Sequence, residues 1–170
     1  VGTFPAIKPA AAMTRSGTIG LLGTAATIRQ GYVDRLEAEF AQGKRLLRAA
    51  APELVGAAEA KLRGESVDPA VIRRAAALLR DQPGGDMIDT VVLACTHFPL
   101  IKAELAEAFG PGVEFVDGAS GIARRIASLL AGQELVRSQP DLALFTRDSA
   151  EIAALQPALH RYGLDRTGVL

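Results

Sequence analysis

The segment from Ile88 to Pro99 constrains the fold more than any other part of the chain. Four apolar residues in it, Val91 to Ala94, stand directly before a thiol, a hydroxyl and an imidazole, and a proline follows two residues later. This order predicts a buried strand over 88–94 that ends in polar groups. Because side chains i and i+2 of a strand share a face, we expect Cys95 and His97 to point the same way beyond the strand's end.

The rest of the chain alternates between short apolar runs and amphipathic segments. Residues 1–11 are expected to be extended. Strands are expected over 18–22, 44–50, 88–94, 113–116 and 142–146, and helices over 26–42, 52–62, 69–80, 99–109, 122–132 and 148–160. Strands that alternate with helices predict an α/β protein, layered α/β/α around a mainly parallel sheet. Ligands of such sheets bind beyond the carboxyl ends of the strands, where Thr24, Cys95 and Asp117 are expected.

Composition narrows the possible partners and the compartment. The chain has 170 residues, of which 49% are hydrophobic and 5% aromatic, a balance typical of helix-rich α/β proteins. Its 19 basic and 19 acidic residues are mixed along the sequence, which argues against nucleic acid as a partner. A single cysteine cannot form an internal disulfide, and no apolar run approaches a membrane span, so we expect a cytoplasmic protein without membrane contact.

Cys95 and His97 are the first candidates for chemistry. A thiol beside a group that can take its proton becomes a nucleophile or a base. The alternative is that Cys95 is an ordinary small core residue, which is common for a free cysteine. The other histidine, His160, is expected to have no such role.

Thr24 and Thr27 follow a glycine at the start of an expected helix. Free N–H groups there favour anions, and the two hydroxyls would add directional hydrogen bonds. Either threonine could instead only cap the helix. Asp117 is expected to cap the helix that follows it. Arg124 and Arg125 could contact an anion, although a solvated helix face is the simpler interpretation.

Several segments resemble the glutamate racemases of the aspartate/glutamate racemase superfamily, in the family's own order. The segments are Phe4–Ala11, Ile19–Thr27, Ala58–Leu62 with Gly64-Glu65, the run Ala94-Cys95-Thr96-His97-Phe98-Pro99-Leu100, and Phe115–Asp117 with Ile122–Arg125. The chain departs from the family where Asp117 is followed by Gly118-Ala119-Ser120-Gly121 rather than by Ser-Gly. Together these segments cover most of the chain, so it is identified as similar to the C-terminal portion of such an enzyme.

The resemblance implies a function: cofactor-independent interconversion of L- and D-glutamate by two thiols, supplying D-glutamate for peptidoglycan. Cys95 would be one of the thiols and His97 its partner, assisted by Glu59, or by Glu65 if the alignment slips. Thr96, Thr24 and Thr27 would bind glutamate. No metal and no cofactor are implied, and a homodimer is possible.

The resemblance also implies a domain division. Residues 1–116 would form the family's second domain, and residues 117–170 would belong to the first domain, whose N-terminal strands are absent. The Asp-Ser-Gly turn and the other cysteine motif, Cys-Asn-Thr, which the family carries in its first domain, do not occur in this sequence. We therefore expect the chain alone to be inactive as a racemase.

Three alternatives stay open. Aspartate racemase belongs to the same superfamily, and arylmalonate decarboxylase-like enzymes use a single cysteine as proton donor. The pair Thr24 and Thr27 and the imidazole of His97 fit glutamate racemase better. The third alternative is a truncated domain that has no activity and binds a partner or itself.

Overall fold

A four-stranded parallel sheet forms the centre of the computed structural model, which describes residues 3–29, 31–136 and 139–170. Its strands lie in the order β2–β1–β3–β4, and every neighbouring pair is parallel. The strands are β1 (Thr18–Gly23), β2 (Arg45–Ala50), β3 (Thr90–Leu93) and β4 (Glu114–Val116). The expected parallel α/β sheet is therefore confirmed, with each strand within two residues of its predicted bounds.

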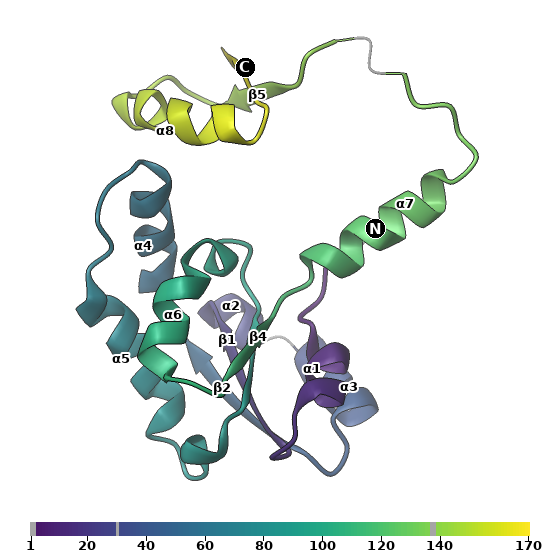
Figure 1. Cartoon of the computed structure of the whole chain (residues 1–170), viewed down its shortest axis with the longest axis vertical. Helices are drawn as coiled ribbons and strands as arrows, with labels where there is room; N and C mark the ends of the chain where they lie inside the picture. Colours follow the sequence, from purple (N-terminus) through teal and green to yellow (C-terminus); the bar gives the residue numbers. More distant parts are fainter. Residues whose placement is uncertain (1–2, 30, 137–138) are drawn as a thin grey trace.

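Helices cover both faces of this sheet (Figure 1). They are α1 (Ile7–Met13), α2 (Ala25–Ile28), α3 (Gly31–Phe40), α4 (Glu53–Leu62), α5 (Pro69–Arg80) and α6 (Lys102–Phe109), with short 3₁₀ turns at Gly85–Met87 and Phe98–Ile101. Helix α7 (Ala119–Leu130) follows β4 and leads away from the sheet (Figure 1). Ile19 and Leu21 of β1 pack with α1 and α3, whereas Leu22 packs with α4, α5 and α6 on the opposite face. This alternation follows from the two-residue period of a strand, and it confirms the α/β/α layering.

Two polar anchors hold the layers at the amino-terminal ends of the strands. Asp89, just before β3, accepts hydrogen bonds from the Thr14 hydroxyl at 2.6 Å and from the backbone N–H groups of Arg15 and Ser16 at 2.8 and 2.7 Å. Partial burial alone would raise the pKa of Asp89, but these bonds and one from Thr90 outweigh it, so the pKa lies well below its usual range. Asp89 thus joins the turn before β1 to the start of β3.

Arg80, at the end of α5, is the second anchor. Its guanidinium donates to the carbonyl oxygens of Phe109 at 2.7 Å and Gly85 at 3.1 Å, with longer contacts of 3.4 Å to those of Asp86 and Ile88. It also lies 5.3 Å from the centre of the Phe109 ring. One side chain therefore connects α5, the loop before β3 and the end of α6.

Two expectations for the N-terminal part are wrong. Residues 7–13 form α1 rather than extended chain, because Pro9 occupies the first helical turn, where a backbone N–H has no helical acceptor and its loss costs nothing. The helix expected over 26–42 is divided into α2 and α3, and Gln30 between them lies outside the described residues. Elsewhere, the helix expected over 69–80 is observed as α5, and Asp68 caps it by accepting the N–H of Ala70 at 2.8 Å.

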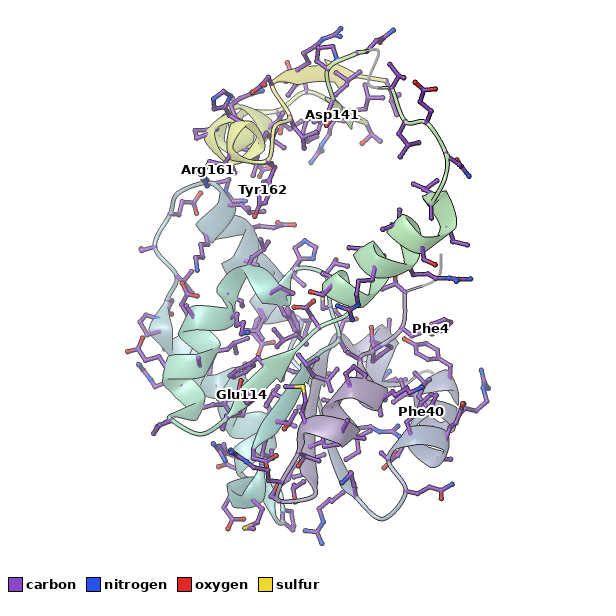
Figure 2. All side chains as sticks on the ribbon, turned by 45° about the vertical axis from the view of Figure 1, so that its right-hand side comes forward. Phe4, Phe40, Glu114, Asp141, Arg161 and Tyr162 are labelled. Atoms are coloured by element: carbon purple, nitrogen blue, oxygen red, sulfur yellow. The ribbon has the colours of Figure 1, made fainter. Side chains whose placement is uncertain are left out.

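The C-terminal residues form a separate small unit. Here β5 (Leu142–Phe145) pairs in parallel with β6 (Arg166–Val169), and α8 (Ala150–Arg161) connects them. The expectation included β5 and α8 but not β6, whose sequence is mostly polar. Ser149 caps α8, since its hydroxyl accepts the N–H of Ile152. The unit lies beyond the end of α4 (Figure 1), and Arg161 and Tyr162 mark it in Figure 2 at the opposite end of the molecule from Phe40. Within the described residues, no helix is long and apolar enough to cross a membrane.

Candidate active site

Cys95 and His97 lie in a turn directly after β3, beyond the end of the strand predicted over 88–94. The last ladder bond of this segment runs from the N–H of Ala94 to the carbonyl of Leu22, and the chain then curls so that the N–H of Phe98 donates to the carbonyl of Cys95. Pro99, at the first turn of the 3₁₀ segment, favours this early curl. The two side chains nevertheless meet, with Cys95 Sγ 3.8 Å from His97 Nδ1. The thiol and the imidazole are therefore held together by a local turn.

The carboxylate of Glu59, from α4, approaches the other nitrogen of the same imidazole. His97 Nε2 lies 3.4 Å from Glu59 Oε1. Glu65 is engaged elsewhere, because Arg63 donates to its carboxylate at 2.7 Å and thereby lowers the pKa of Glu65. Of the two glutamates considered from the sequence, the structure thus places Glu59 beside the imidazole. Carboxylate, imidazole and thiol form a row whose two contacts use opposite ring nitrogens.

The thiol end of this row opens into a cavity of about 370 Å³ at the carboxyl ends of the strands. Three residues proposed from the sequence line this cavity, namely Cys95, Thr96 and Thr27. Thr24 is connected to it through Thr27, since their hydroxyl oxygens are 3.3 Å apart. Thr24 stands at the start of α2 without a side-chain capping bond. Because α2 has only four residues, its dipole is small, and the hydroxyls are the groups that could bind an anion here.

The imidazole end faces a different cavity of about 320 Å³. It is lined by Glu59 and His97 on one side and by residues of the C-terminal unit, among them Phe145 and Ile152, on the other. The row of Glu59, His97 and Cys95 thus connects two hollows, with the thiol facing the first and the carboxylate facing the second.

Further residues line the cavity at Cys95 to which no binding role had been assigned from the sequence. Tyr32 of α3 and Phe4 lie there with their rings edge to face, 5.7 Å between centroids, and Gly118 and Ile122 contribute from the start of α7. Asp117 also lines the cavity, and its carboxylate accepts the N–H of Ala119 at 2.7 Å, as a capping residue does. Asp117 was expected near Cys95 at the strand ends, whereas Tyr32 and Phe4 reach this cavity through the packing of the fold rather than through their spacing in the sequence.

The part of the chain that the structure describes contains no group of three or more histidine, cysteine, aspartate and glutamate side chains arranged to hold a metal ion. The site is instead a thiol, an imidazole and a carboxylate with hydroxyls nearby. A thiol beside an imidazole at the strand ends of a parallel α/β sheet is typical of the class of proteins that move protons or attack substrates with a cysteine.

Within that class, the chain belongs to the Asp/Glu/Hydantoin racemase family, whose model matches residues 1–126. It is 60% identical over 165 residues to glutamate racemase of Sphingopyxis alaskensis, covering 96% of this chain and 62% of that protein. It is 41% identical to glutamate racemase of Sodalis glossinidius over 176 residues, covering 100% of this chain and 60% of that protein. The chain therefore spans about three-fifths of these relatives' length.

Among solved structures, the chain resembles Escherichia coli glutamate racemase in complex with L-glutamate and the activator UDP-MurNAc-Ala. The TM-score is 0.90 at 37% identity, over 100% of this chain and 64% of that one. A second similar structure, glutamate racemase isoform RacE1 of Bacillus anthracis, has a TM-score of 0.72 at 20% identity and supports the fold alone. The similarity to the E. coli enzyme includes the C-terminal unit.

Proposed function

We propose that this chain carries one of the two proton-transfer sites of a glutamate racemase, an isomerase that interconverts L- and D-glutamate. The observation that supports this most is the row in which Cys95 contacts one nitrogen of His97 and Glu59 contacts the other. The relatives named glutamate racemase add independent support. Peptidoglycan synthesis, which consumes D-glutamate, is the proposed use of the product.

Cys95 would act as the base. Removing the Cα proton of an amino acid leaves a carbanion, so a positioned base and dipoles for the developing charge are needed. The Cys95 thiolate would take the proton from one face of glutamate and become a thiol, while the electron pair stays on Cα. Reprotonation from the opposite face inverts the centre and requires a second acid, which the only cysteine of this chain cannot supply at the same time.

His97 and Glu59 would control whether the thiol of Cys95 is protonated. The imidazole can accept the thiol proton at Nδ1, and the resulting positive ring would be stabilised by the carboxylate at Nε2. Thr96, Thr24 and Thr27 would donate hydrogen bonds to the carboxylates of glutamate, holding Cα within reach of Cys95. In the reverse direction the same groups would return the proton to Cα.

The test is formation of D-glutamate from L-glutamate by the 170-residue chain, alone and co-expressed with the segment of the S. alaskensis relative that the chain does not match. We expect turnover only in the combined sample, abolished by Cys95→Ser. His97→Asn should reduce it strongly, by about 10²-fold or more. The matched control is His160→Asn, since His160 is exposed and pairs with Asp165 in the C-terminal unit. Substantial turnover by the chain alone, or by Cys95→Ser, would contradict the proposal.

The alternatives within the superfamily are separated by substrate. Aspartate racemisation or arylmalonate decarboxylation faster than glutamate racemisation would favour them. No observation on the described residues favours either over glutamate.

The domain division and the assembly belong to the same proposal. We infer that residues 1–116 form one domain and that residues 117–170 pack against another, since β5 and β6 do not join the four-stranded sheet and no residue of α7 is buried. A cytoplasmic location and a homodimer remain predictions, the latter to be tested by light scattering.

A further inference from the structure

The side chain of Arg63 lies between two carboxylates at the end of α4. Glu59 precedes it by four residues, and Glu65 follows it by two. Residues four apart on a helix are neighbours on its surface, and a glutamate that precedes the basic residue is the favourable order. Arg63 and Glu59 also line the same cavity of about 320 Å³, together with His97. The guanidinium therefore has two carboxylates with which it could pair.

Within the described residues, the guanidinium pairs with Glu65 and not with Glu59. Arg63 Nε donates to Glu65 Oε1 at 2.7 Å, and Nη2 lies 3.4 Å from Oε2. This hydrogen bond raises the pKa of Arg63, slight burial opposes the rise, and the carboxylates of Glu151 and Glu59 add smaller contributions to it. The carboxylate of Glu59 is left to the imidazole, with Oε1 at 3.4 Å from His97 Nε2.

A glycine turn holds Glu65 in this position. The N–H of Gly64 donates to the carbonyl of Lys61 at 3.0 Å. The N–H of Glu65 donates to the carbonyl of Ala60, also at 3.0 Å. These are the two bonds that end a helix through a left-handed residue, and Gly64 has the required positive φ of +83°. The turn folds Glu65 back over the last turn of α4, where Arg63 lies.

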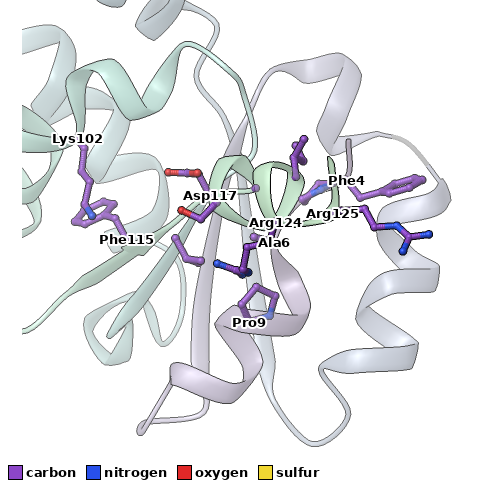
Figure 3. A pocket seen from close by; sticks show the side chains of 14 residues that line it. Phe4, Ala6, Pro9, Lys102, Phe115, Asp117, Arg124 and Arg125 are labelled. Carbon is purple, nitrogen blue, oxygen red and sulfur yellow. The ribbon is translucent and has the colours of Figure 1, made fainter. Parts of the chain in front are cut away.

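Stability alone does not account for this ion pair. Glu65 is exposed, and exposed ion pairs contribute little to folding. Other exposed cations of the chain have no such partner. Figure 3 labels Lys102, Arg124 and Arg125 near the end of β4, and none of them is in an ion pair among the described residues.

The other titratable groups around His97 leave its contact with Glu59 in place. Cys95 contacts the opposite ring nitrogen. Arg147 and Glu151 line the cavity from the C-terminal unit, and their charges are opposite in sign. Within this lining, the guanidinium at the end of α4 is therefore the cation placed to compete for the carboxylate.

We propose that Glu65 is a positioning residue for the pair of Glu59 and His97. By holding the guanidinium of Arg63, it leaves the Glu59 carboxylate available to the imidazole. A guanidinium that turned to Glu59 would weaken the stabilisation of the positive ring, which would then be a poorer acceptor for the thiol proton. This inference rests on the proposed function, in which the imidazole takes the proton of Cys95.

The test is the pKa of His97 in the 170-residue chain, measured from the imidazole NMR signals as the pH is varied. The chain has two histidines, so His160→Asn identifies the signal of His97. Glu65→Gln frees the guanidinium and should lower the pKa of His97 by about 0.5 or more. Replacing Arg63 with Met in the same variant removes the competing cation and should restore the pKa.

The matched control is Glu53→Gln, because Glu53 is an exposed glutamate in the first turn of the same helix, and it should leave the pKa of His97 unchanged. Three results would overturn the proposal: an unchanged pKa in Glu65→Gln, an equal shift in Glu53→Gln, or a shift that persists when Arg63 is also replaced. The titration needs no substrate, so it is independent of the racemisation assay that tests the proposed function. Circular dichroism of each variant checks that the helices are intact.

Discussion

Replacing Arg80 with methionine tests whether one side chain joins α5, the loop before β3 and the end of α6. The substitution keeps most of the apolar stem and removes the guanidinium, so the carbonyl oxygens of Phe109 and Gly85 lose donors at 2.7 and 3.1 Å. The contacts of 3.4 Å to the carbonyl oxygens of Asp86 and Ile88 are too long to contribute as much stability as hydrogen bonds of normal length. Two charge-assisted hydrogen bonds of normal length are worth about 1.5–3 kcal/mol each.

The groups are only partly buried, so water can solvate the freed carbonyls and recover some of this energy. We therefore expect the free energy of unfolding to fall by about 2–4 kcal/mol. Urea unfolding followed by far-UV circular dichroism measures this change. The slope of the unfolding free energy against urea concentration should be the same in both proteins. Arg80→Lys should recover only a part of the lost stability, because an ammonium group lacks the planar guanidinium fork that reaches two carbonyl oxygens at once.

The control is Arg74→Met on the same helix, an exposed arginine for which the structure describes no hydrogen bond or ion pair. It should change the stability by less than about 0.5 kcal/mol. If Arg80→Met costs no more than Arg74→Met, the guanidinium does not connect these elements, and the reasoning fails.

Three further predictions concern other positions. Asp89→Asn should destabilise the chain at neutral pH and have little effect in strong acid. Because the folded-state pKa of Asp89 is lowered, its carboxylate stabilises the fold above the unfolded-state pKa, and this contribution is lost as the pH falls through the folded-state pKa. The urea unfolding curves of the two proteins should therefore converge at low pH. Gly20→Ala should lower the free energy of unfolding by about 1–3 kcal/mol, because the new Cβ would lie 2.9 Å from Leu79 Cδ1. Gly56→Ala, with open space around residue 56, should instead raise it by about 0.5–1 kcal/mol in the same urea assay. Lys61→Met should lower the free energy of unfolding by less than about 1 kcal/mol, since the ion pair of Lys61 with Glu104 is partly exposed. A drop in melting temperature that corresponds to a larger loss would contradict this prediction.

The sequence predicted the central sheet well because the period of its apolar residues is a local property. Gly20 and Leu22 alternate with Ile19 and Leu21, and the two sets pack on opposite faces as the alternation requires. The polar strand β6 shows the limit of this signal. Its residues form a strand because β5 lies beside them, and that pairing depends on contacts distant in the sequence.

The candidate site likewise has parts that could be predicted from the sequence and parts that could not. The neighbourhood of Cys95 and His97 followed from their spacing, although through a turn rather than a pleated strand. The position of Glu59 beside the imidazole depends on how α4 packs against the turn after β3, which spacing alone left undecided between two glutamates. Tyr32 could not be assigned at all, since it reaches the cavity from a helix that bears no motif.

The bonds to Asp89 lie at the amino-terminal ends of the strands, whereas Cys95 follows the carboxyl end of β3. Stability and chemistry are thus assigned to opposite ends of the same sheet. A library of substitutions in the turns around Cys95 should therefore retain the fold far more often than an equal library around Asp89. The cleft of such a chain can be altered for a new substrate while its scaffold stays intact.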